Sequence, residues 1–69
     1  MKLIDILNKK VNEELEDGTR FALGQFVYRY NANGDIIIRE ADGQAMGQTI
    51  AIDNWLKHNV YILKDDEEN

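Results

Sequence analysis

The sequence contains no cysteine, no serine and no proline, and its only histidine is His58. Without cysteine there is no disulfide, and hence no disulfide argument for secretion. A structural zinc site takes about four cysteine or histidine ligands, so we expect no metal and no cofactor. Thr19 and Thr49 carry the only aliphatic hydroxyl groups, so nucleophilic catalysis of the usual kind lacks its reagent. We therefore predict no catalytic residue, and we interpret His58 as a surface or helix-capping side chain.

Long apolar runs are also missing. No stretch approaches the roughly 20 residues that cross a membrane. The segment from Met1 to Leu7 is interrupted by charge and lacks the small-residue cleavage site of a secretory signal peptide. We expect a cytosolic protein that does not associate with a membrane.

The excess of acidic residues is concentrated at one end of the chain. The formal net charge is −5, and four carboxylates stand at positions 65–68. We predict one folded domain over residues 1–64 and a disordered acidic tail over 65–69. The near-neutral body does not resemble a DNA mimic, and the overall acidity argues against nucleic acid as a partner.

Apolar residues at helical spacing predict an amphipathic helix over residues 3–15. Gly18 is suited to a left-handed cap at its end. The predicted apolar stripe consists of Leu3, Ile4, Leu7, Val11 and Leu15.

From residue 19 the apolar period changes to two, which predicts β-strands. A hairpin over residues 19–30 turns at Gly24-Gln25. Asn33-Gly34 can adopt positive φ at little cost, and we expect a second turn there before a third strand over residues 35–40.

The remaining segment is less regular. Residues 41–49 are interpreted as a loop that could hold a short strand. Asp53 is expected to cap a short helical turn ending at Lys57, and a last strand covers residues 60–63. The predicted fold class is α+β, with the N-terminal amphipathic helix packed on a small antiparallel sheet. That sheet is a three-strand meander plus a C-terminal strand.

Alternation assigns one set of side chains to the sheet face opposite Phe21, Leu23, Tyr28 and Ile38. The set combines arginine with small aliphatic residues, as the centres of protein interfaces do. An ordinary solvated sheet face is the alternative interpretation. The residues on this candidate partner-binding face are Arg20, Ala22, Val27, Arg29, Ile37 and Arg39.

A second candidate partner-binding surface lies at the end of the predicted helix. Glu13, Glu14 and Glu16 gather where the helix macrodipole is already negative. Each such placement costs only a few tenths of a kcal/mol, and a solvated, partly frayed helix end is the favoured interpretation of these residues.

Other ligands receive weaker support. The segment Asn31–Asp35 is rich in oxygen, but it lacks the bidentate glutamate of a calcium loop, and a hairpin turn explains it. The aromatic residues could stack on nucleic acid with Arg20, Arg29 and Arg39 on the phosphates, although we expect them to form the core. This nucleic-acid-binding accessory protein is the alternative function.

Self-association is the third alternative. A core of this size contributes roughly 3–5 kcal/mol net, and domains this small often gain further support from a second subunit. A homodimer through exposed aliphatic residues therefore stays open.

Three stretches together resemble a known group of proteins: Leu3–Lys9, Asp17–Phe21 and Trp55–Leu63. Their order is similar to that in a loose group of very small, largely uncharacterised proteins encoded by phages and prophages of Gram-positive bacteria. The resemblance implies a bacterial cytosolic setting and no catalytic residues. It also implies a protein that binds and blocks a host or defence protein by occlusion, as anti-CRISPR-type inhibitors do.

Overall fold

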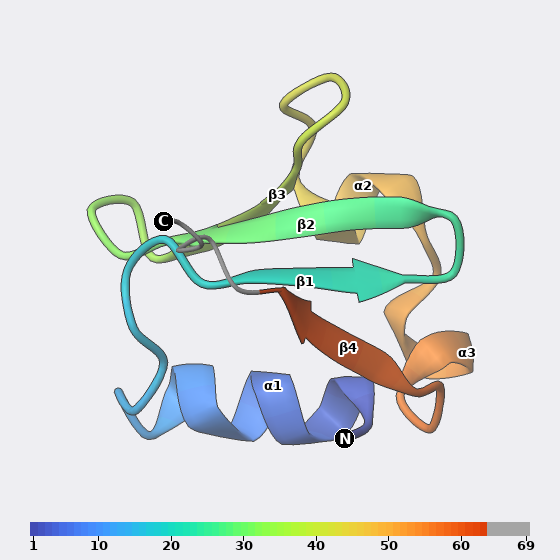
Figure 1. Cartoon of the computed structure of the whole chain (residues 1–69), viewed down its shortest axis with the longest axis horizontal. Coiled ribbons are helices and arrows are strands. Elements are labelled where there is room, and N and C mark those ends of the chain that lie inside the picture. The colour runs from blue at the N-terminus through green and yellow to red at the C-terminus, as the bar shows by residue number, and fades with distance from the viewer. Residues whose placement is uncertain (64–69) are drawn as a thin grey trace.

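The computed structural model describes residues 1–63, so the predicted tail over 65–69 lies outside the described residues. One helix and a four-stranded antiparallel sheet dominate the fold, and the strand order is β3-β2-β1-β4. Figure 1 shows α1 beside β4, with α2 passing behind β2. The predicted α+β fold is therefore confirmed. The elements are α1 (Leu3–Val11), β1 (Arg20–Leu23), β2 (Phe26–Asn31), β3 (Ile36–Arg39), α2 (Met46–Thr49), α3 (Ile52–Trp55) and β4 (Val60–Leu63).

Helix α1 ends four residues earlier than predicted, at Val11. The amide of Glu13 donates to the carbonyl of Lys10 at 3.1 Å, and the amide of Glu14 donates to the carbonyl of Lys9 at 2.7 Å. This pair of bonds is the Schellman arrangement, which requires a left-handed residue between the helix and the departing chain. Glu13 takes that position with φ of 60°. The cap is therefore built on a glutamate, five residues before the glycine that the sequence favoured.

The buried stripe of α1 also differs from the prediction. Leu3 and Ile6 are fully buried and Leu7 packs against the same core, whereas Val11 is 77% exposed. Ile4 lies on the exposed side as well. The spacing i, i+3, i+4 from Leu3 is one face of a helix. The helix was therefore predicted correctly, but the face that it buries is rotated by about one residue from the predicted face.

The β1–β2 hairpin has the predicted two-residue loop, because Leu23 pairs with Phe26. Gly24 has φ of 62°, and a Cβ atom built there would stand 3.4 Å from the Trp55 ring. The turn after β2 also forms as predicted, but its positive φ falls on Asp35 (52°) and not on Gly34. Aspartate tolerates that conformation better than most residues.

The segment before β4 is more helical than predicted. Met46–Thr49 forms a helical turn where a loop was expected, and the Met46 side chain is buried in the core. Helix α3 begins at Ile52, so Asp53 lies within its first turn, and the N-cap position is held by Ala51 without a side-chain hydrogen bond. Within the described residues, no helix has the length and hydropathy that a membrane span requires.

One core holds these elements together. Phe21 and Tyr28 are fully buried and stack across β1 and β2 with ring centroids 5.9 Å apart. The Tyr28 hydroxyl bonds to Thr49 Oγ1 at 2.8 Å, so the buried phenol is satisfied. The buried side chains are those of Leu3, Ile6, Phe21, Leu23, Tyr28, Tyr30, Ile37, Met46 and Val60.

We expect Glu13→Gly to raise the free energy of unfolding by about 0.5–1 kcal/mol, because glycine relieves the left-handed strain at some cost in chain entropy. Urea titration measures the change. Glu13→Ala removes the same charge but keeps Cβ, so its stability should stay close to that of the parent chain. Equal gains from both substitutions would show that charge, and not backbone strain, limits the helix end.

Candidate functional site

The two faces of the sheet are different in kind. Leu7, Leu15, Ile50, Ile52 and Trp55 pack against the core cluster from one side, here called the core face. On the opposite side, no helix of residues 1–63 packs on the sheet, and we call that side the outer face. Cross-strand partners share a face, so the pairing assigns the residues. The outer face includes Arg20, Ala22, Val27, Arg29, Ile38, Glu40, Tyr61 and Leu63.

The structure corrects the predicted face at three positions of β3, Ile37, Ile38 and Arg39. Ile37 pairs with Tyr30 and is buried in the core, and Arg39 pairs opposite Tyr28. Both lie on the core-face side of β3, whereas Ile38 lies on the outer face opposite Arg29. Three consecutive isoleucines carry no alternation, so the sequence could not show which of them faces inward. A one-residue change of register exchanges the faces completely.

An ion-pair cluster lies on the outer face. Arg20 donates two hydrogen bonds to Glu40, from Nε at 2.7 Å and from a terminal nitrogen at 3.0 Å. Arg29 Nε approaches Glu40 Oε2 at 3.4 Å. Because Glu40 continues the β3 ladder by donating its amide to the Val27 carbonyl at 2.9 Å, its carboxylate is held between the two arginines. Sequence analysis missed Glu40, because it placed Ile38 on the inner face and so assigned the position two residues later to that face as well.

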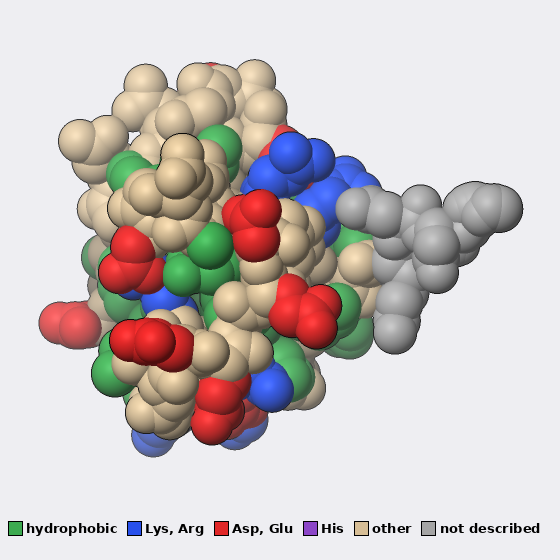
Figure 2. All heavy atoms as spheres, turned by 90° about the vertical axis from the view of Figure 1, so that its left-hand side faces the viewer, with side chains coloured by type: hydrophobic (Ala, Val, Ile, Leu, Met, Phe, Trp, Pro, Cys, Tyr) green, Lys and Arg blue, Asp and Glu red, His purple; other side chains and the backbone are tan. Residues whose placement is uncertain are grey.

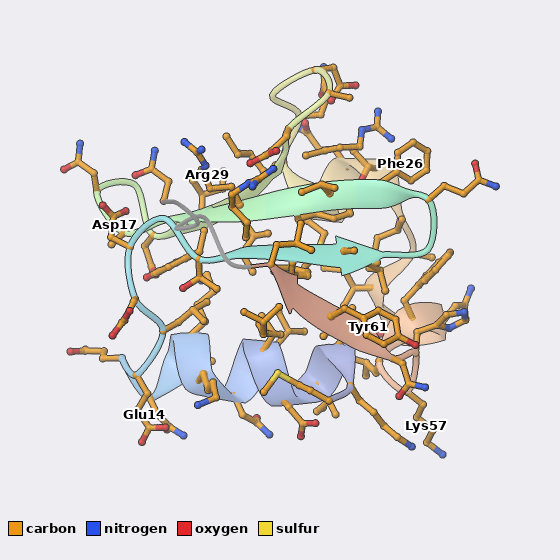
Figure 3. The ribbon with its side chains drawn as sticks, in the orientation of Figure 1. Glu14, Asp17, Phe26, Arg29, Lys57 and Tyr61 are labelled. Carbon is orange, nitrogen blue, oxygen red and sulfur yellow. The ribbon has the colours of Figure 1, made fainter. Side chains whose placement is uncertain are left out.

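Aliphatic and aromatic side chains surround this cluster. Ala22, Val27 and Ile38 are half-buried, and Tyr61 is 65% exposed. Figure 3 shows Arg29 on β2 and Tyr61 on β4. The arrangement places a bidentate arginine–carboxylate pair among apolar side chains on a rigid four-stranded scaffold.

Arg39 belongs to a separate group at the hairpin end of β2. Its guanidinium lies 4.9 Å from the centroid of the Phe26 ring and donates from Nε to Asp42 at 3.1 Å. That hydrogen bond holds the pKa of Asp42 below its usual value. The three arginines therefore do not form one positive face. The arrangement that supported the nucleic-acid-binding alternative is not present.

The second candidate surface, which is acidic, lies on the connection between α1 and β1 and not at the end of a helix. Glu13, Glu14 and Glu16 all lie between α1 and β1, and all are exposed. Figure 3 shows Glu14 and Lys57 at opposite ends of the molecule. Figure 2 views the molecule from the end at which Glu14 lies, and it shows acidic side chains spread over that end around an apolar patch.

A further surface was not found from sequence. An apolar groove of about 350 Å³ lies between α1, β3 and α2. Exposed Val11 and Ile36 contribute to it, and its presence depends on the unpredicted turn at Met46. The lining residues are Leu7, Lys10, Val11, Asp35, Ile36, Ile37, Ala45, Met46, Gly47 and Ile52.

The groups that could perform chemistry are engaged in structural bonds. Thr19 Oγ1 donates to the Glu16 carbonyl at 2.7 Å, and Thr49 Oγ1 contacts Met46 and Tyr28. His58 is exposed and its ring packs on Trp55, with centroids 4.3 Å apart. Among the residues described, no group of three histidine, cysteine or acidic side chains is placed to hold a metal ion.

The turn between β2 and β3 carries a buried phenol beside a carboxylate. Tyr30 donates to Asp35 Oδ1 at 2.9 Å, and Lys10 Nζ lies 3.4 Å from the same oxygen. The Asn31 side chain accepts from the Asn33 amide at 3.0 Å, as expected for a turn. The hydrogen bond to Asp35, followed by burial, raises the pKa of Tyr30.

No protein-family model, no curated protein and no solved structure matches the chain. The site is therefore interpreted from its own residues.

We expect stability to fall as pH rises from about 10, the ordinary tyrosine pKa, through the higher pKa of folded Tyr30. Below that range Tyr30 is protonated in both states, and within it the unfolded chain is ionised while the folded chain keeps its proton. Tyr30→Phe should make the pH dependence of urea unfolding shallower between pH 9 and 11 (about one unit either side of that pKa).

Asp35→Asn is the matched control, because it keeps the phenol and the turn but removes the carboxylate. Ultraviolet titration of tyrosinate should then show a lower pKa for Tyr30. An unchanged titration would mean that Asp35 does not control this group.

Proposed function

We propose that this chain is a non-enzymatic protein-binding domain whose partner covers the outer face of the sheet. The observation that carries the proposal is the composition of that face. An arginine–glutamate cluster stands among half-buried aliphatic residues, and no helix of residues 1–63 packs over it.

The chemistry of the outer face suits a protein partner. Arginine and tyrosine are the residues most enriched among those that dominate binding energy, and Arg29 and Tyr61 are both exposed here. Glu40 holds Arg20 in a bidentate pair, so less side-chain freedom is lost when a partner docks. Val27 and Ile38 supply the apolar area between the charges.

The narrower form of the proposal is inhibition. In the phage setting that the resemblance implies, the partner is a host or defence protein, and binding blocks its working surface by occlusion, as an anti-CRISPR-type inhibitor would. The resemblance supports this form, and the site residues support only the binding. The exposed carboxylates Glu13, Glu14 and Glu16 would favour a target with a basic channel.

The sharpest test compares two arginines that the structure assigns to different faces. Arg29→Ala should weaken capture of the partner by about tenfold or more, because hot-spot side chains contribute at least about 2 kcal/mol. Arg39→Ala should leave capture unchanged. The measurement is affinity capture from a Gram-positive lysate with quantitative mass spectrometry, with and without nuclease, after circular dichroism has shown that both variants fold.

Two results would contradict the proposal. Equal loss of capture for both variants would remove the outer face as the interface. Retention only of nucleic acid, or of proteins released by nuclease, would favour the accessory-protein alternative.

A further inference from the structure

The two edges of the sheet are closed to different extents. At the β3 edge, the Arg39 amide donates to the Gln44 carbonyl at 2.7 Å, and Ala45 forms a bridge with Ile38. This edge is therefore covered by the chain that follows it. Covering an edge in this way is how proteins prevent unwanted strand pairing.

The β4 edge is closed only at its start. The Val60 amide donates to the Met1 carbonyl at 2.8 Å, and Lys2 forms a bridge with Asn59. Backbone groups of a strand point alternately to its two sides, so the Ile62 amide and carbonyl point away from β1, as the Val60 amide does. Within residues 1–63, no group bonds to the backbone of Ile62.

Nothing in β4 protects this open half of the edge. The strand Val60–Leu63 contains no charged residue and no proline, the usual protecting features. Ile62 is 41% exposed. An open edge with these properties is a template for an added strand.

A groove of about 290 Å³ lies between this edge, α1 and the connection after it. Alternate side chains of a peptide added at this edge point into the groove, where the carboxylates of Glu14 and Glu16 stand beside the Lys9 ammonium group. The residues that line it are Met1, Ile6, Lys9, Glu14, Leu15, Glu16, Thr19 and Ile62.

We propose that the open edge of β4 binds an extended peptide segment in which basic and apolar residues alternate. The segment adds a fifth strand to the four-stranded sheet through the Ile62 amide and carbonyl. Successive side chains of a strand point to opposite faces, so its basic side chains enter the groove toward Glu14 and Glu16, and its apolar side chains lie on the other face beside Tyr61. The contact is centred on the β4 backbone and not on Arg29, so the inference stands or falls separately from the proposed function.

Charge decides between this occupant and a second copy of the chain. The net charge of the chain is −5. Pairing two β4 edges would bring the carboxylates of one copy toward those of the other, which is unfavourable at low salt. A basic segment from a different protein meets complementary charge.

The probe is a capped hexapeptide of alternating lysine and valine, added at low salt to the isotope-labelled full chain. Nuclear magnetic resonance should show shifts confined to β4, Met1 and the groove, and slower hydrogen exchange at the Ile62 amide. The same peptide with glutamate in place of lysine is the matched control, and it should bind at least tenfold more weakly.

Ile62→Pro tests the backbone contact, because it removes an amide that makes no bond within the sheet. It should abolish peptide binding, whereas Ile62→Val, which keeps that amide, should retain it. Glu14→Lys with Glu16→Lys gives a second test away from the strand, and it should weaken binding severalfold at low salt and less at high salt.

Several results would overturn the inference. These are shifts that bypass β4, equal binding by the proline and valine variants, equal binding of the two peptides, or a β4-paired dimer in place of the peptide complex. Arg29→Ala should not affect the peptide, so a failure here is distinguishable from a failure of the outer-face proposal.

Discussion

The stacked pair of Phe21 and Tyr28 is the contact on which the other packing depends. Both rings are fully buried, they join β1 to β2, and they contribute to the same core as Leu3 of α1 and Met46 of α2. Removing a buried aromatic ring costs about 3–5 kcal/mol. A core this small contributes about the same amount in total. The buried residues of the core face are therefore required for folding, and a binding function uses residues outside this core.

The helices of residues 1–63 cover one face of the sheet. Helix α1 and the short turns α2 and α3 all pack on the core face. Within residues 1–63, these helices leave the outer face and half of the β4 edge uncovered. The two surfaces offer different chemistry. The outer face presents fixed side chains with charge and apolar area, whereas the edge presents main-chain groups, which recognise an extended backbone whatever its sequence and leave selectivity to charge and groove shape.

The two surfaces meet along β4, because Tyr61 belongs to the outer face and Ile62 to the edge and its groove. One partner could therefore contact both. The carboxylates of the α1–β1 connection lie at one end of this region, and they exist as an exposed group because the helix ends at Val11 and the chain turns through Glu13. Helix length, a local backbone property, thus determines where the acidic surface lies.

The sequence by itself determined the fold class, both hairpin turns and the faces of β1 and β2, because apolar alternation and turn-forming residues encode these locally. It did not determine the face of β3, since Ile36, Ile37 and Ile38 are alike and only pairing with β2 distinguishes them. Tertiary structure also decided that Met46 enters the core and that Glu40 joins Arg20 and Arg29. Each of these depends on contacts between residues distant in sequence, which periodicity and spacing cannot report.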